Sequence, residues 1–327
     1  MKYINKINGL LFISLALTLV AGAQAQWQPD RNVALIVPST AGGSLDNVGR
    51  TIQRAWDLQK LVPVSSTIIN MGGGGHAIAY NFLDQRAGNP LFMSITSSTL
   101  HASHINGRTK LSYRDFTPLT VMLTEYIAFA VRADSPLKTG KDLVEALRAD
   151  PAKYSLALSS AVGGTHHISF GMPLLSGKVD LRKTKMVAFT STGEAVTALL
   201  GGHVDVLSGG TVQIAPHVAS GKMRLLAVSS AQRLPGALAS GPTWPELGYK
   251  GVFENWRGII GTKGLTRAQI AYWDNVFSKI AASDDFKSIA DKNQWVINYK
   301  NAAETRKFFE DEYGEIKAVM DSVGLSK

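Results

Sequence analysis

Residues 33–46 read VALIVPSTAGGSLD, and this stretch decides the fold class. The apolar run 33–37 predicts a buried strand, because a strand that helices cover on both faces has no alternating polar positions. The glycines behind Pro38 allow a tight turn, and the residues beyond them predict a helix that starts near Ser44 or Asp46. A strand, a glycine-rich turn and a helix in this order predict a βαβ unit in an α/β protein.

The same order recurs along the chain. Four glycines, Gly72–Gly75, follow a predicted strand at 66–69, and Gly163–Gly164 follow another at 155–158. Prolines and glycines over 235–248 predict a loop-rich crossover. A length of 327 residues also favours two domains over one. The sequence therefore predicts two α/β lobes, each a mostly parallel sheet flanked by helices, with a cleft between them.

Glycine-rich turns between a strand and a helix are suited to binding anions. A backbone without Cβ can be approached closely, and the N–H groups and dipole of the following helix favour negative charge. A single such turn is equally well explained as a tight connection between a strand and a helix, but three of them favour a ligand site. Gly72, Gly74 and Ala77 fit the dinucleotide fingerprint formally, yet no acidic ribose ligand follows the next strand, so no cofactor is predicted.

The N-terminus has the pattern of an export signal. Lys2 and Lys6 precede an apolar run over 7–21, and Ala23-Gln24-Ala25 supplies the small residues of a cleavage site. Residues 1–25 are therefore predicted to be a signal peptide cleaved after Ala25, which would place the mature protein in the periplasm. An uncleaved anchor helix is the alternative, although the apolar run is short for a membrane span.

Composition excludes several functions. The chain has no cysteine, so thiolate catalysis and Cys-ligated metals are ruled out. The 34 Lys and Arg residues exceed the 25 Asp and Glu residues, for a net charge of +9, which falls to +7 when Lys2 and Lys6 leave with the signal peptide. Because the basic residues are scattered, with the densest cluster only at 182–185, the charge indicates attraction of small anions and not nucleic-acid binding.

Catalytic and metal-binding patterns are weak. Neither G-x-S-x-G nor a complete phosphate-binding loop motif occurs in the sequence. The pair His101 and His104 could bind a metal, and His166 or His167 could act as a base or a ligand. Neither pair has a carboxylate nearby in the sequence, so a structural role is favoured and no metal site is predicted. Asp46 is also explained as a helix-capping residue.

In its motifs the chain resembles the solute-binding proteins of tripartite tricarboxylate transporters, the Bug-type periplasmic receptors. The resemblance covers the mature chain and depends on the order and spacing of several segments, none of which decides it alone. These segments are 37–46, 70–75, 159–166, 199–205, 220–233 and 242–258.

The resemblance implies a two-lobe periplasmic binding protein, type II-like, with the ligand in the interdomain cleft. Residues 26–124 plus 252–327 would form the first lobe and residues 125–251 the second. It also implies a monomeric receptor, not an enzyme, that needs no cofactor and delivers a small organic carboxylate to the membrane permease subunits of such a transporter.

The ligand-binding residues implied by the resemblance lie in the loops of both lobes. Those of the first lobe are Ser39, Gly42, Gly43, Asp46, Gly74, Gly75, Ser97, Ser98 and Thr99. Those of the second lobe are Ser160, Gly163, Gly164, Thr165, Thr190, Ser191, Thr192, Gly193 and Ser208.

The second lobe departs from the family pattern. Family members commonly have an aromatic P-Y-K-G loop where residues 188–193 read AFTSTG, and an acidic residue where Ser208 stands. Because this chain lacks that lysine and that acid, we expect hydroxyl groups of the second lobe to contact the ligand, which would be either a dicarboxylate or an aromatic carboxylate. The alternatives are a secreted hydrolase or isomerase that uses His166 or Asp46 as base, and a sensing adaptor for a two-component system.

Overall fold

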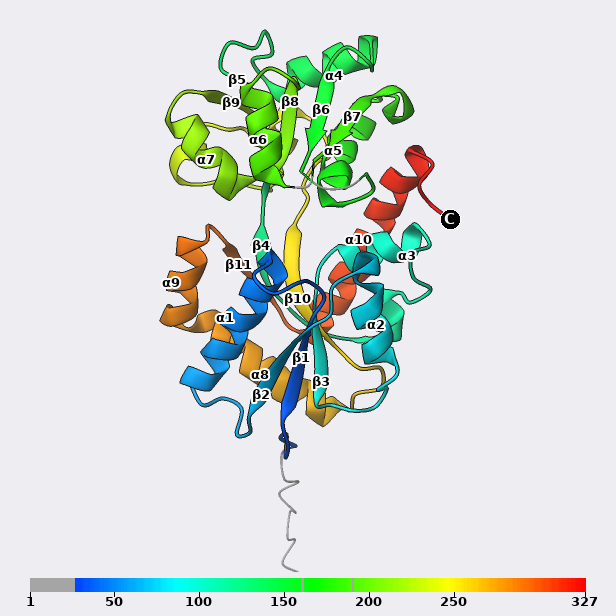
Figure 1. Ribbon diagram of the computed structural model, residues 1–327, viewed down its shortest axis with the longest axis vertical. Coiled ribbons are helices and arrows are strands. Elements are labelled where there is room, and N and C mark those ends of the chain that lie inside the picture. The colour runs from blue at the N-terminus through cyan, green and yellow to red at the C-terminus, as the bar shows by residue number, and fades with distance from the viewer. Residues whose placement is uncertain (1–26, 160–161, 190) are drawn as a thin grey trace, which may run out of the picture.

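The computed structural model describes residues 27–159, 162–189 and 191–327, which form two lobes joined by extended segments (Figure 1). The predicted signal peptide and two predicted site residues, Ser160 and Thr190, lie outside the described residues. Among the described residues, no helix is long and apolar enough to cross a membrane.

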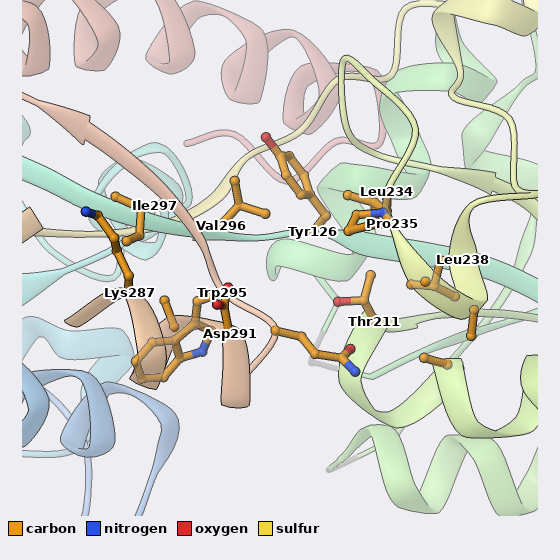
Figure 2. A pocket seen from close by; sticks show the side chains of 15 residues that line it. Tyr126, Thr211, Leu234, Pro235, Leu238, Lys287, Asp291, Trp295, Val296 and Ile297 are labelled. Carbon is orange, nitrogen blue, oxygen red and sulfur yellow. The ribbon is translucent and has the colours of Figure 1, made fainter. Parts of the chain in front are cut away.

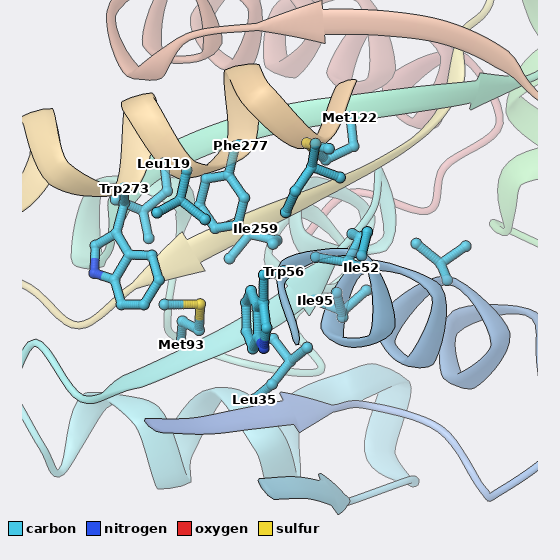
Figure 3. Close-up of a cluster of buried hydrophobic side chains, with 14 of the residues drawn as sticks. Leu35, Ile52, Trp56, Met93, Ile95, Leu119, Met122, Ile259, Trp273 and Phe277 are labelled. Atoms are coloured by element: carbon cyan, nitrogen blue, oxygen red, sulfur yellow. The ribbon is translucent and has the colours of Figure 1, made fainter. Parts of the chain in front are cut away.

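The first lobe is built on a six-stranded sheet in the order β11-β4-β10-β3-β1-β2. Its strands are β1 (Val33–Val37), β2 (Ser66–Asn70), β3 (Phe92–Thr96), β4 (Thr117–Glu125), β10 (Asn255–Gly261) and β11 (Val296–Lys300). Helices flank it: α1 (Ser44–Leu58), α2 (Ala77–Asp84), α3 (Thr99–Ile105), α8 (Arg267–Ala282) and α9 (Asp284–Lys292). On one face, Trp56 of α1 packs with Trp273 and Phe277 of α8 over the sheet (Figure 3). This core fixes the start of α1 relative to the strand ends.

The second lobe is built on a five-stranded sheet in the order β7-β6-β8-β5-β9. Its strands are β5 (Ile127–Arg132), β6 (Ser155–Leu158), β7 (Lys185–Ala188), β8 (Val206–Gly210) and β9 (Met223–Val228). The helices are α4 (Gly140–Ala149), α5 (Thr165–Ser176), α6 (Thr192–Leu200) and α7 (Thr211–Ala219). In each sheet one strand that arrives from the other lobe, β10 or β5, runs antiparallel to its neighbours. The predicted fold class, two α/β lobes with helices on the sheets, is confirmed.

Three segments connect the lobes. Two are extended: the passage from β4 through Tyr126 into β5, and the passage into β10. The third is helix α10 (Ala302–Ser322), which begins in the first lobe, where Phe309 packs against Trp256. Its later residues Ile316 and Met320 belong to the apolar core of the second lobe. The last helix therefore packs against both lobes, although the family resemblance assigns it to the first.

The contact between α10 and α5 depends on a glycine. A Cβ on Gly171 would overlap Val319 Cγ1, whereas a Cβ on Gly314 of α10 would meet nothing within 4 Å. We expect Gly171→Ala to push the helices apart and to lower the free energy of unfolding by about 1–3 kcal/mol. Gly314→Ala should raise it by up to about 1 kcal/mol, because alanine is the better helix former.

Urea unfolding midpoints of the two variants and the parent protein provide the measurement. The Gly314→Ala variant is the matched control for a glycine-to-alanine change inside a helix. If Gly171→Ala were as stable as the parent protein, the close approach of α5 and α10 would be wrong.

Candidate ligand site between the two lobes

The loop between β1 and α1 is held by Asp46. Gly42 has a φ of +81° and donates its N–H to Asp46 Oδ2 at 2.8 Å. Arg50 Nε donates to the same oxygen at 2.9 Å, and Asn70 Nδ2 donates to Oδ1 at 2.9 Å. The side-chain hydrogen bond from Arg50 lowers the pKa of Asp46 to about 2, although burial opposes this. Both oxygens of this predicted ligand residue therefore bind protein donors and fix the loop.

The loop between β2 and α2 packs against the first loop. Gly73, Gly74, Gly75 and His76 all have positive φ, which explains the glycine run, because residues with a Cβ rarely adopt this conformation. A Cβ on Gly72 would lie 3.2 Å from Thr40 N, so the two loops are in close contact. A hollow of about 560 Å³ lies at the start of α1 and is lined by the first loop and the first turns of that helix.

The predicted serine turn after β3 lies beside the second loop. Ser97 Oγ accepts the N–H of Thr99 at 3.3 Å, and Ser98 is fully buried. Ser98 Oγ has no hydrogen-bond partner among the described residues. A chain of hydrogen bonds runs from Thr96 Oγ1 through Tyr80 OH to His76 Nδ1 (3.0 and 3.2 Å), so this turn is tied to the glycine loop.

In the second lobe, the predicted loops meet at the carboxyl ends of β6 and β8. Gly163 has a φ of +81° and donates its N–H to His167 Nδ1 at 2.8 Å, which places Gly164 and Thr165 at the start of α5. A Cβ on Gly209 would lie 2.8 Å from Thr192 Cγ2, so the start of α6, with Gly193, packs beside β8.

Two other predicted residues are bound within the second lobe. Ser191 Oγ caps α6 by accepting the N–H of Glu194 at 3.2 Å. Ser208 Oγ lies 3.5 Å from His166 Nδ1 and is fully buried. The structure thus brings the described site residues of the second lobe together around the starts of α5 and α6.

Except for α6, which Ser191 caps, the helices that follow these loops begin without a side-chain hydrogen bond at the cap. Among the described helices, α1 and α5 start behind Gly43 and Gly164, and α7 behind Gly210, with no side-chain hydrogen bond at the cap. In contrast α4, α8, α9 and α10 are capped by Thr, Ser or Asn side chains. An uncapped helix start leaves N–H groups available for an anion.

Arg257 of β10 is a buried cation near the junction of the lobes that the sequence analysis did not predict. Its side chain is 9% exposed, and Nη2 forms an ion pair with Glu125 of β4. Arg257 Nε is buried and has no hydrogen-bond partner among the described residues. Burial, and then the charge of Arg257, lowers the pKa of both His76 and His166 to about 4. One buried cation thus influences both lobes across the cleft.

His101, one of the histidines considered as metal ligands, has a structural role. His101 Nδ1 lies 2.9 Å from Glu312 Oε2, and Trp256 Nε1 donates to both oxygens of Glu312 at 2.8 Å. The carboxylate partner of His101 therefore exists but comes from α10, far along the sequence. Within the described ranges, no group of three His, Asp or Glu side chains could hold a metal ion. Trp256 itself is fully buried and does not line the cleft.

Two α/β lobes, two extended crossovers and glycine-rich loops at the strand ends are typical of the class of solute-binding proteins. A family model described as the tripartite tricarboxylate transporter family receptor matches residues 50–325. The chain belongs to this family of receptors, which confirms the resemblance found in the sequence.

Curated relatives and solved structures agree with this assignment. The chain is 24% identical to a UPF0065 protein of Cupriavidus necator over 94% of this chain and 92% of that protein. It is 26% identical to the protein BugT of Bordetella pertussis over 78% and 77% of the two chains. A solute-binding protein from Polaromonas has the same fold, with a TM-score of 0.80 at 23% identity over 90% of this chain and 99% of that one.

Two further structures of the same fold contain ligands. One is a Rhodopseudomonas palustris protein with adipate, at a TM-score of 0.72 and 23% identity over 91% of this chain and 99% of that one. The other is MatC from the same species with malate, at a TM-score of 0.67 and 22% identity over 90% and 99%. At this identity they show the fold alone.

The role of Asp46 predicts a pH effect on stability. The pKa of Asp46 is about 2 in the folded protein, compared with 3.8 for an aspartate without these contacts. Ionised Asp46 therefore stabilises the fold above pH 4, and this stabilisation is lost as the pH falls to 2. Asp46→Asn should lower the free energy of unfolding by about 1–3 kcal/mol at pH 7, and by progressively less between pH 4 and 2.

Urea unfolding at several pH values provides the measurement, with the exposed Asp291→Asn as control, whose profile should stay parallel to that of the parent protein. A constant difference between the parent and Asp46→Asn from pH 7 to 2 would contradict this role of Asp46.

Proposed function

We propose that the chain is a periplasmic receptor that captures a small organic carboxylate between its lobes and delivers it to the permease of a tripartite tricarboxylate-type transporter. The family assignment supports the transport role. A structural relative, BugD, is described as a periplasmic binding protein, and the predicted signal peptide agrees with export. Adipate and malate in two relatives are both dicarboxylates, which supports a carboxylate ligand here.

The observation that carries this proposal is the distribution of helix caps. At the predicted loops, α1 in the first lobe and α5 in the second begin uncapped behind glycine, as does α7 after β8, whereas α6 is capped by Ser191 and α4, α8, α9 and α10 are capped by their own side chains. A missing cap costs about 1 kcal/mol, so uncapped starts gathered at one place favour a ligand that supplies the acceptor. A carboxylate has acceptor oxygens and the charge that the helix dipole favours.

Arg257 extends the site predicted from the sequence. Its charge acts on His76 of the first lobe and on His166 of the second, and its buried Nε, which has no hydrogen-bond partner among the described residues, would donate to a carboxylate oxygen. Because both imidazoles are neutral above about pH 4, they act at neutral pH as hydrogen-bonding groups and not as further cations. The proposed site is therefore the glycine loops with the helix starts of both lobes, and Arg257 between them.

Binding would favour the closed arrangement of the lobes, taken as residues 26–124 plus 252–327 and 125–251. A ligand that contacts loops of both lobes binds the closed state more tightly and shifts the population toward it. The extended passages through Tyr126 and into β10 are the segments that would absorb the rotation.

The geometry favours a receptor over the hydrolase or isomerase alternative. Asp46 has both oxygens occupied by protein donors, which leaves it no proton-accepting role toward a substrate. A pKa of about 4 makes His166 a weak base at neutral pH. A receptor therefore explains the arrangement of these two residues better than a catalyst does.

A carboxylate panel tests the proposed function. At a hundredfold excess over Kd, a bound carboxylate should raise Tm by about 4 °C, whereas the matching primary amides should not. Differential scanning fluorimetry of the purified mature protein with mono- and dicarboxylates provides the measurement. If none of the carboxylates changed Tm, the proposal would be wrong.

The role of Arg257 has its own test. Arg257→Gln should weaken carboxylate binding by about 10- to 100-fold, because a charge-assisted hydrogen bond is lost. Lys263→Gln is the control, since Lys263 pairs with Asp115 just beyond the far end of β10. Isothermal titration calorimetry should show a lower affinity for the first variant and an unchanged affinity for the second. Equal affinities for both variants would place the carboxylate elsewhere.

A further inference from the structure

A large apolar cavity lies on one flank of the cleft. It has a volume of about 620 Å³ and lies between η4 (Gly236–Leu238) with α7 of the second lobe and α9 with β11 of the first (Figure 2). For comparison, an apolar cavity of about 150 Å³ holds one benzene molecule. The space is therefore large enough for a ring together with several methylene groups.

The cavity is lined mainly by apolar and aromatic side chains. Tyr126, Leu234, Leu238, Trp295 and Val296 surround it from both lobes, as Figure 2 shows. Its one lysine, Lys287, forms an ion pair with Asp284 at 3.0 Å. Among the described lining residues, no other Lys or Arg is present to bind a second ligand carboxylate. This wall therefore suits an apolar group and not a second negative charge.

The cavity lies next to the proposed carboxylate site. Glu125 Oε1 accepts hydrogen bonds from Ser44 Oγ at 3.3 Å and from Trp295 Nε1 at 3.0 Å. Ser44 lines the hollow at the start of α1, and Trp295 lines the apolar cavity. On the other side Thr211, the first residue of α7, lines the cavity directly behind β8. The two spaces thus share a wall in the first lobe and a helix start in the second.

We propose that this cavity receives the apolar tail of the ligand, so that the receptor selects a monocarboxylate with an alkyl or aryl chain over a dicarboxylate of the same length. The inference rests on the proposed function, since the carboxylate head would bind at the glycine loops and Arg257. The tail would displace water from the walls formed by Trp295, Leu234 and Leu238, which is favourable in proportion to the apolar area covered.

Calorimetric titration of the mature protein with butanoate, hexanoate, octanoate, 3-phenylpropanoate and adipate tests the inference. Affinity should rise about fourfold for each buried methylene group from butanoate to octanoate. Hexanoate should bind more tightly than adipate, which has the same number of carbons and a second carboxylate. Equal affinities along the series, or a preference for adipate over hexanoate, would overturn the inference.

Two variants locate the tail. Ala237 is exposed and lines the cavity, so Ala237→Trp should fill it and lower octanoate affinity by more than about tenfold, the equivalent of two methylenes, while butanoate is unaffected. Val296→Asp, at a position that is 39% exposed, should act in the same direction by placing a charge against the tail. Ala239→Trp is the matched control, an exposed alanine just beyond η4 and outside the cavity wall.

The outcomes separate this inference from the proposed function. If short carboxylates bind but neither chain length nor the Ala237→Trp and Val296→Asp variants change affinity, the cavity inference is wrong and the receptor stands. If no carboxylate binds, short or long, the proposed function itself is wrong and the inference falls with it. A loss of octanoate affinity in Ala239→Trp equal to that in Ala237→Trp would also overturn the cavity inference.

Discussion

One carboxylate, that of Glu125, holds the region where the lobes meet. Glu125 is the last residue of β4, directly before the chain passes into the second lobe. It pairs with Arg257 of β10 and accepts hydrogen bonds from Ser44 at the start of α1 and from Trp295 in front of β11. The helix start, the returning strand and the cavity wall are therefore positioned by the same group. Since Glu125 is partly buried, losing one donor would leave its charge poorly compensated, which couples these elements energetically.

The sequence predicted the elements whose pattern is local. The strand at 33–37 is continuously apolar, and the glycine-rich turns after it and after the strands at 66–69 and 155–158 mark the starts of helices. These local patterns predicted most strands and helices of both lobes. Strands β4, β10 and β11 and helices α3 and α7 were not predicted. Strand β10 contains Arg257 and two glycines, a composition untypical of a central strand, and its pairing with β3 and β4 joins residues far apart in the chain.

In the candidate site, too, the sequence predicted local features but not contacts between distant residues. The glycine loops were predicted because glycine has a conformational meaning that a single sequence reveals. The role of Asp46 was only half predicted: its place in the first turn of the helix was, but the N-cap is Gly43, and the donors Arg50 and Asn70 that occupy its oxygens were not predicted. Arg257 and the bond between His101 and Glu312 were missed, because each depends on a partner more than a hundred residues away. Periodicity and spacing carry no information about such pairs.

The last helix limits how the lobes can move. If only the two extended passages joined the lobes, each lobe could rotate freely relative to the other about these passages. Because α10 packs Phe309 in one lobe and Ile316 with Met320 in the other, a rotation that separated α10 from α5 would expose apolar surface in the second lobe. Exposing such side chains costs about 1.5–3 kcal/mol each, more than a weakly bound ligand could offset. The closure proposed above would therefore keep the contact between α5 and α10 and open or shut the opposite flank, where the apolar cavity lies between α7 and α9. With that motion, the cavity would be the part of the cleft whose width changes most with ligand binding.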